Sequence, residues 1–388
     1  MEVYLDNNNV TRIDPLVFEE MIPYLKDRAY GHPAALHGPG AAALEAVEES
    51  RAKLASLIGA RGEEVVFTSG GTEANNLAVI GAALASRSRG RHVIVSSIEH
   101  QSVLFSAEKL SSLGFEVDYA PVDKEGFVKL DELERLLRRD TILVSVNFVN
   151  DEIGTIEPVR ELVELVRDKS PEAIVHTDAV EAFIKVDVDV RKLDVDLATL
   201  SSHKIHGPRG AGALYIREGT SIEPIMYGPV ATSKLRPGLE NVPAIVGFAK
   251  AAEIGVRGME EFTRHMRALR DKLMDGILDG IEHTVLNGPR ELRSPSNLNV
   301  SFLYAEGEAI MMMLSQHGVY VSSGSACASR LLEPSHVLKA IGKSHAEMHG
   351  SISFSVSRFN TMEEIEYVLE VLPRVIKRLR EMSAWKPR

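Results

Sequence analysis

The feature that most constrains the fold is an alternation of extended and helical patterns from residue 40 to about residue 217. One helix face is marked by apolar residues at helical spacing, namely Leu44, Val47, Leu54 and Leu57. Short apolar runs typical of buried strands lie at residues 65–67, 92–95, 115–119, 142–146, 173–176, 197–200 and 212–216. Such alternation is typical of α/β domains. The sequence therefore predicts a large α/β domain at residues 15–255, with a seven-stranded, mostly parallel sheet.

A different pattern follows the boundary that we expect near residue 255. Apolar residues keep helical spacing at Phe262, Met266, Leu269, Leu273 and Ile277, which predicts a helix long enough to bridge two domains. Apolar and polar residues then alternate in residues 298–302 and again in 352–356, which indicates strands covered by helices on one face. We therefore expect a smaller α+β domain formed by residues 1–14 and 256–388.

Composition excludes several classes of protein. The chain has 44 basic and 55 acidic residues, a formal charge of -11 and no run of lysine or arginine, so nucleic acid is a poor candidate partner. Its single cysteine excludes an internal disulfide framework and a cysteine-only metal site, and we expect no bound metal. Neither a secretion signal nor an apolar run of about 18 residues is present. We expect a cytoplasmic protein without a membrane partner.

Three motifs place polar groups at the ends of expected strands. Gly70, Gly71 and Thr72 lead from a strand into a helix, where free N–H groups and a hydroxyl form a phosphate cradle, although an ordinary capped turn explains the same residues. His100 follows another strand and is expected at the carboxyl edge of the sheet, where open α/β sheets bind ligands. Asp178 follows a third strand, where it can pair with a buried cation such as a pyridinium nitrogen or cap a helix.

A lysine and the only cysteine complete the set of candidate chemical groups. Lys204 follows a strand and is flanked by Ser201 and His203, a setting in which its pKa can be depressed for Schiff-base chemistry, whereas most lysines are solvated surface charges. Cys327 lies among serine, glycine and alanine, which suits a reactive thiol better than the buried small side chain that most free cysteines are. A phosphate cradle, a stacking imidazole, a pyridinium partner and an amine are the parts that pyridoxal phosphate requires.

Across nearly its whole length, the chain resembles the cysteine desulfurases, which are pyridoxal-phosphate enzymes of the fold type I aminotransferase class. The matching stretches are residues 4–8, 67–76, 99–100, 178, 201–208, 323–327 and 332–338. The resemblance implies a homodimer that acts on L-cysteine, forms alanine and passes the sulfur to an iron–sulfur scaffold protein or another acceptor.

The resemblance also implies roles for individual residues. Lys204 would form the Schiff base with the cofactor and move the substrate α-proton, while Cys327 would attack the substrate sulfur and become a persulfide. His100 would stack on the cofactor ring, and Asp178 would pair with its nitrogen. The phosphate would be bound by Thr72, Ser201 and His203 beside Gly71.

Five positions bear on departures from the family pattern. Asp151 and Glu181 replace amides near the phenolic oxygen of the cofactor. Ionised carboxylates accept hydrogen bonds and cannot donate them, so either these acids or the cofactor oxygen would carry a proton. Ser353 replaces an arginine that grips the substrate carboxylate, and Arg358 is the candidate replacement further along the chain. Leu239 replaces a hydroxyl that reaches the phosphate from the neighbouring subunit.

Three interpretations remain open from the sequence. The leading one is a cysteine desulfurase, a sulfurtransferase that needs both Lys204 and Cys327. A second is a related pyridoxal-phosphate lyase or aminotransferase with another amino substrate, or a paralogue of low activity, which would need Lys204 alone. The third is a binding or scaffolding protein whose cofactor chemistry has decayed.

Overall fold

The computed structural model describes residues 1–323 and 335–383. The larger sheet of these residues consists of β2 (Val65–Thr68), β3 (His92–Ser96), β4 (Glu116–Ala120), β5 (Thr141–Ser145), β6 (Ile174–Asp178), β7 (Leu197–Ser201) and β8 (Gly212–Ile216). Their order is β2-β8-β7-β6-β5-β3-β4, and β8 runs antiparallel to both neighbours while the other adjacent pairs are parallel. The predicted seven-stranded, mostly parallel sheet is confirmed.

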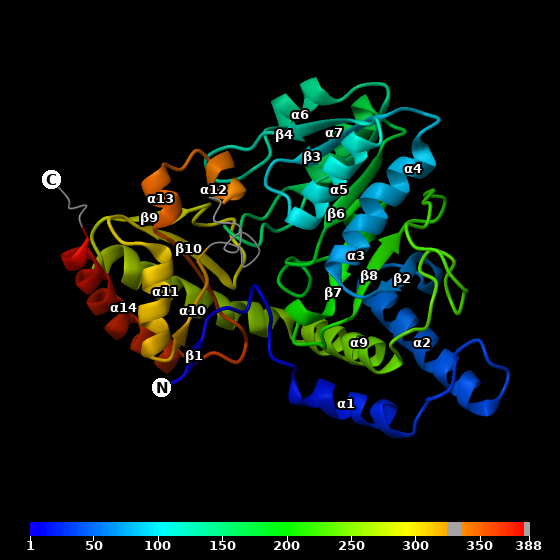
Figure 1. Ribbon diagram of the computed structural model, residues 1–388, viewed down its shortest axis with the longest axis horizontal. Helices are drawn as coiled ribbons and strands as arrows, with labels where there is room; N and C mark the ends of the chain where they lie inside the picture. The colour runs from blue at the N-terminus through cyan, green and yellow to red at the C-terminus, as the bar shows by residue number, and fades with distance from the viewer. Residues whose placement is uncertain (324–334, 384–388) are drawn as a thin grey trace.

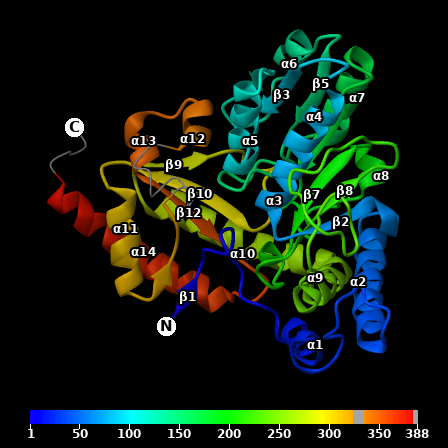
Figure 2. The same cartoon turned by 45° about the vertical axis from the view of Figure 1, so that its right-hand side comes forward.

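Helices cover both faces of this sheet because its strands carry apolar side chains on both faces. Ile94 and Val144 point into one core, which includes residues of α1 (Pro15–Lys26), α2 (Gly38–Leu57), α6 (Leu130–Leu136), α7 (Val159–Lys169) and α9 (Val242–Arg257). Val93 and Val95 point into the opposite core, with α3 (Gly71–Asn76), a π-helical turn (Leu77–Gly81), α4 (Ala82–Ser86) and α5 (Gln101–Ser112). Figures 1 and 2 show α1, α2 and α9 side by side.

A smaller antiparallel sheet, in the order β12-β10-β9, comprises β9 (Thr284–Asn287), β10 (Asn297–Phe302) and β12 (Ser351–Ser355). Its apolar face, which includes Val300 and Phe354, packs with residues of α10 (Met259–Gly280), α11 (Gly307–Gln316) and α14 (Met362–Met382). Its other face is mostly polar but also largely buried, and includes Asn287, Asn297, Asn299, Ser301, Ser351, Ser353 and Ser355. Two short helices, α12 (His336–Ala340) and α13 (His345–His349), precede β12.

The N-terminal segment runs from the smaller sheet to the edge of the larger one (Figure 1). β1 (Val3–Tyr4) pairs in parallel with β11 (Val319–Tyr320), and Asp6 forms a bridge with Ser355 of β12. The N–H of Thr11 then donates to the carbonyl oxygen of His203, at 3.0 Å. Residues 5–11 therefore lie against both sheets.

Three further features complete the fold. α8 (Val190–Leu193) precedes β7. Because α9 ends at Arg257 and α10 begins at Met259, a helix junction lies beside the boundary expected near residue 255, and the division into two domains stays a prediction. None of the helices in the described part of the chain is long and apolar enough to span a membrane.

Candidate active site

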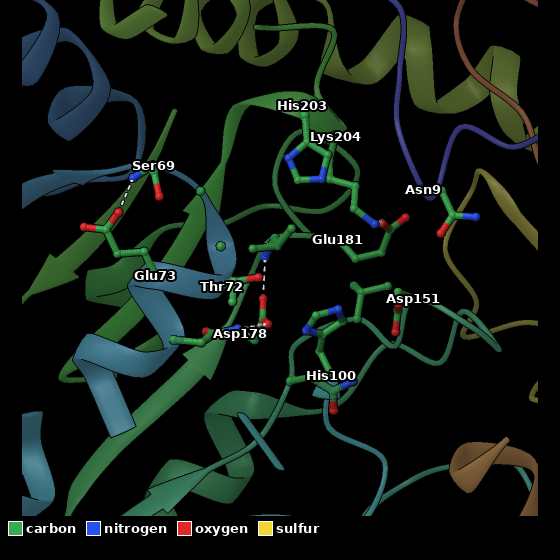
Figure 3. A pocket seen from close by; sticks show the side chains of 16 residues that line it. Asn9, Ser69, Thr72, Glu73, His100, Asp151, Asp178, Glu181, His203 and Lys204 are labelled. Carbon is green, nitrogen blue, oxygen red and sulfur yellow. Dashed lines mark hydrogen bonds and ion pairs between the residues drawn. The ribbon is translucent and has the colours of Figure 1, made fainter. Parts of the chain in front are cut away.

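A cavity of about 370 Å³ lies at the carboxyl edge of the seven-stranded sheet (Figure 3). Its walls come from segments that each follow a different strand. Gly71 and Thr72 follow β2, His100 follows β3, Asp178 ends β6, and Lys204 follows β7. This is the edge at which open α/β sheets bind ligands. The residues predicted from separate motifs are thus brought together in one place.

The loop after β2 has the shape of an anion cradle. Gly70 has φ +155, and Gly71 leaves no room for a side chain, because a Cβ there would lie 2.9 Å from Val180 Cγ2. A helix that begins at Gly71 leaves the N–H groups of its first turn without intrahelical partners, so they can face a phosphate. His203 lines the same cavity, and burial lowers its pKa to about 4, so its ring is neutral at pH 7.

Asp178 is fixed at the bottom of the cavity by two donors. Asn75 Nδ2 donates to Oδ2 at 2.6 Å, and the N–H of Val180 donates to Oδ1 at 2.9 Å. Burial raises the pKa of Asp178, an effect that the neighbouring His100 partly opposes. His100 is the N-cap of α5, and its Nδ1 accepts from the N–H of Ser102 at 3.1 Å. A carboxyl group in such surroundings is well suited to a partner with a cationic N–H.

Lys204 lies among carboxylates. Its Nζ donates to the carbonyl oxygen of Asn8 and is 3.4 Å from Glu181 Oε2. Burial raises the pKa of Asp151, but the charges of His100, Lys204 and His336 together outweigh burial and hold that pKa below its usual value. Asp151 is therefore ionised at neutral pH. Between the two alternatives left open by the sequence, this direction favours an ionised Asp151 in the cofactor-free protein.

The turn that carries Asp151 is held by side chains from outside the larger sheet. The carbonyl oxygen of Asp151 accepts from Asn8 Nδ2 at 3.0 Å and from Asn297 Nδ2 at 3.2 Å. The next carbonyl, of Glu152, accepts from Asn297 at 3.1 Å and from Asn299 at 3.2 Å. The Glu152 side chain is buried and accepts from the hydroxyl of Ser335 at 2.7 Å.

The residues present fit pyridoxal phosphate. Two oxygens of lining residues, Asn75 Oδ1 and Asn147 Oδ1, are buried without a hydrogen-bond partner in the described part of the chain. Buried oxygens of this kind are costly unless a ligand or water donates to them. Together with the cradle at Gly71 and the carboxyl of Asp178, they provide polar groups suited to a phosphate, a ring nitrogen and polar ring substituents.

Most of the predicted site residues line this cavity. They are Gly71, Thr72, His100, Asp151, Asp178, Glu181, His203 and Lys204. Ser201 is fully buried behind them, and its hydroxyl forms a hydrogen bond with His203 Nδ1 at 2.7 Å. The predicted Cys327 lies outside the described residues.

Ser353 and Arg358 are not among the described residues that line this cavity, and their part in substrate binding stays a prediction. Ser353 lies on the buried polar face of the smaller sheet. The guanidinium of Arg358 is paired with Asp14 and lies over the ring of Phe262, because its position along the chain directs it behind Lys204 into a separate small cavity.

Sequence reasoning missed several lining residues. Asn75 and Asn147 line the cavity with unsatisfied oxygens, and Glu73 accepts from the N–H of Ser69 at 2.8 Å and pairs with Arg236 at 3.2 Å. Glu73, in the first turn of α3, and Asn75 stand inside the glycine motif, so their place beside the cradle was an available signal. Nothing in the local sequence marks Asn147, which follows an apolar strand.

Comparison with known proteins gives concordant matches over nearly the whole chain. Residues 3–368 match the family described as Aminotransferase class-V. Cysteine desulfurase IscS 1 of Archaeoglobus fulgidus is 47% identical over 98% of both chains, and cysteine desulfurase IscS of Methanosarcina thermophila is 46% identical over 100% of this chain and 95% of its own. A solved structure of a NifS-like protein superposes with a TM-score of 0.92 at 40% identity, covering 98% of this chain and 100% of the other.

Proposed function

Because the chain belongs to the aminotransferase class-V family and is a pyridoxal-phosphate-dependent cysteine desulfurase, we propose that Lys204 is its Schiff-base lysine and Cys327 its sulfur acceptor. The observation that carries this proposal is the convergence of Lys204, His100, Asp178 and the Gly71 cradle on one cavity. Each follows a different strand, so their meeting is a property of the fold.

The cofactor would be held by contacts at several points. The first turn of α3, with Thr72 and His203, would bind the phosphate, while Asp178 would hold the proton of the ring nitrogen. Bound pyridoxal phosphate would supply an electron sink that acidifies the substrate α-carbon and takes up electron density when the bond between the β-carbon and sulfur breaks. Lys204, whose Nζ faces the cavity, would carry the α-proton away and return a proton to carbon.

Cys327 would complete the reaction by taking the sulfur. Its thiolate would attack the sulfur of L-cysteine, so that an S–S bond forms as the C–S bond breaks. The electron pair of the broken bond remains on the substrate carbon, which is protonated to give alanine. The persulfide on Cys327 would then pass to an iron–sulfur scaffold protein or another sulfur acceptor in the cytoplasm.

A second candidate function is suggested by the lack of an arginine, among the described lining residues, that could bind the carboxylate of an amino-acid substrate. None of the described residues that line the cavity is an arginine, and Arg358 is paired with Asp14. A bidentate arginine contact is the strong way to fix an amino-acid carboxylate. A related reaction on an amino substrate other than L-cysteine, independent of Cys327, is the alternative that this observation supports.

We also propose that the protein acts as a homodimer. Large apolar side chains are exposed in two segments, near the N-terminus at Leu16, Phe18, Leu25, Tyr30 and Leu36, and in the loop before α9 at Met226, Tyr227, Val230 and Leu239. Exposed apolar side chains gathered in this way are typical of surfaces that another chain covers. The second segment includes Leu239, at the position where the family reaches into the neighbouring site.

The test is product analysis with purified, cofactor-loaded protein, L-cysteine and a reductant. We expect equal yields of alanine and sulfide from the parent, no alanine from Lys204→Ala, and no sulfide from Cys327→Ala. Lys192→Ala, which removes an exposed lysine far from the cavity, serves as the control and should retain full activity. Alanine formation that persists in Cys327→Ala would contradict the role of Cys327 as sulfur acceptor, and its absence from a cofactor-loaded parent would favour the second candidate.

A further inference from the structure

A second buried lysine lies behind Lys204. Lys185 is four residues from Glu181, and their side chains are 7% and 3% exposed. Lys185 Nζ donates to Glu181 Oε1, while Glu181 Oε2 is 3.4 Å from Lys204 Nζ. Figure 3 shows the ends of the Glu181 and Lys204 side chains facing each other. One carboxylate is therefore shared between two lysines.

The backbone beside Lys185 is held in an unfavourable conformation. Ile184 has φ +64, a region that β-branched residues rarely enter. Its side chain fills the space beside Gly255, where an added Cβ would lie 2.6 Å from Ile184 Cγ2. Strain of this kind costs on the order of 1–3 kcal/mol and persists where the surrounding structure requires it. Lys185, whose Nζ donates to Glu181 Oε1, directly follows this residue.

Several charged groups surround Lys204, and Glu181 is the one that lies between Lys204 and Lys185. The titratable groups that face Lys204 are Asp6, Asp151, Glu181, Lys185 and His203. Burial lowers the pKa of Lys185, Glu181 opposes that effect, and the positive charge of Lys204 adds to it. Glu181 Oε2 is buried and has no hydrogen-bond partner within the described residues, so its charge is directed at Lys204.

We propose that Glu181 and Lys185 form an ion pair that sets when Lys204 gives up its proton. Glu181 favours the ammonium form of Lys204 by attraction. Lys185 limits this effect by holding the other carboxylate oxygen and by repelling the Lys204 charge. Lys204 attacks a carbonyl only as a neutral amine, so one proton leaves its Nζ for solvent before it can bind the cofactor.

The pair also explains why an acid stands at residue 181. A glutamine there would leave the buried ammonium of Lys185 without a counter-charge, and removing one partner of a buried ion pair is strongly destabilising. Lys185 is a positioning residue in this scheme, because it acts on Lys204 through Glu181. The inference rests on the proposed role of Lys204.

The test uses cofactor-free protein, so it does not depend on turnover. The rate at which pyridoxal phosphate binds covalently is followed by absorbance as a function of pH, and borohydride reduction with peptide mapping identifies the lysine. Glu181→Gln should lower the midpoint pH of this rate by about one unit, the smaller end of the effect of a nearby opposite charge. Lys185→Met should raise the midpoint by a similar or smaller amount.

Controls separate this electrostatic effect from a structural one. Lys192→Met removes a lysine paired with Asp187 at the surface and should leave the midpoint unchanged. The double variant Glu181→Gln/Lys185→Met removes both charges together, so it remains informative if either single variant fails to fold. Its midpoint pH should lie between those of the two single variants. If the single variants do not fold, the midpoint of the double variant should lie within about half a pH unit of the parent. Midpoints that shift in the same direction in the two single variants, or a double variant outside this range, would overturn the inference. Borohydride labelling of a lysine other than Lys204 in the parent would instead overturn the proposed function.

Discussion

The two sheets contribute to the site in different ways. The seven-stranded sheet buries apolar side chains on both faces and presents its chemical groups at strand ends, as with Asp178 at the end of β6 and Lys204 after β7. The three-stranded sheet buries one apolar face and one polar face, and its asparagines bind the backbone of the turn at Asp151. One sheet therefore supplies the reacting groups, while the other aligns a segment that lies between them.

This difference predicts where stability and alignment reside. Apolar burial contributes roughly 25 cal/mol for each Å² removed from water, whereas a buried hydrogen bond contributes only about 1 kcal/mol net. The apolar face of the smaller sheet should therefore contribute most of the stability of that sheet. The polar face should contribute less to stability and should mainly align the turn at Asp151.

The largest effect is expected from the apolar face. Phe354→Ala removes a side chain that is 1% exposed and should reduce the free energy of unfolding by about 3–5 kcal/mol. Ser353→Ala, at the adjacent position on the opposite face, should cost about 1 kcal/mol or less. Denaturant unfolding of the two variants measures the difference. Equal losses of unfolding free energy in the two variants would show that the apolar face does not contribute more to stability than the polar face.

An intermediate effect is expected at Glu152, between the two sheets. Burial raises the pKa of Glu152 from 4.5 to about 7. The folded protein therefore keeps a proton that the unfolded chain has released, and this group makes stability fall as pH rises from about 4.5 to about 7. Glu152→Gln stays neutral, so it should remove up to about 3 kcal/mol of that loss.

Unfolding free energies at pH 5 and pH 8 provide the measurement for Glu152. Glu161→Gln, at an exposed position of α7, is the control and should show the pH dependence of the parent. A Glu152→Gln variant whose stability falls as steeply as that of the parent would mean that Glu152 is already ionised in the folded protein.

A smaller effect on stability than at Phe354 or Glu152 is expected at Asn297. Asn297→Ala removes donors to the carbonyl oxygens of Asp151 and Glu152, but Asn8 and Asn299 still donate to them, so the cost should be about 1–2 kcal/mol. The turn should loosen, and kcat should fall by about tenfold, since misplacement by 1 Å can cost about a hundredfold. Steady-state kinetics should show this change.

Asn287→Ala sharpens the comparison at Asn297. Asn287 lies on the same polar face, but its side chain donates to Asn299 and Ser301, both at 2.8 Å, and does not reach the turn. Its loss should lower stability by a similar amount without changing kcat. If both variants lose activity equally, the polar face acts as a unit and Asn297 has no separate aligning role.

The sequence allowed prediction of the elements and of most chemical groups, because each motif follows a strand whose apolar pattern is clear. Gly71, His100, Asp178 and Lys204 could therefore be expected at one edge. The smaller sheet was harder to predict. Alternation in residues 298–302 indicates one polar face, but it cannot tell whether water or another part of the chain covers that face.

Contacts between residues far apart in the sequence also could not be predicted. The contact of Asn297 with Asp151 joins residues 146 positions apart, and no local pattern encodes it. Lys185 reads as an ordinary lysine after a strand, since only the folded structure shows that its ammonium is buried against Glu181. The ion pair of Arg358 with Asp14, near the other end of the chain, is likewise visible only in the folded structure.

The path of the N-terminal segment has a consequence for synthesis on the ribosome. β1 pairs with β11, so Val3 meets its partner Val319 only after more than three hundred further residues have been made, roughly 15 to 60 seconds later. Asn8, whose carbonyl oxygen holds Lys204, lies in this same segment. During translation, the larger sheet can form long before its lysine acquires that contact. The final contacts around Lys204, which the cofactor would meet, are therefore completed late in the synthesis of each molecule.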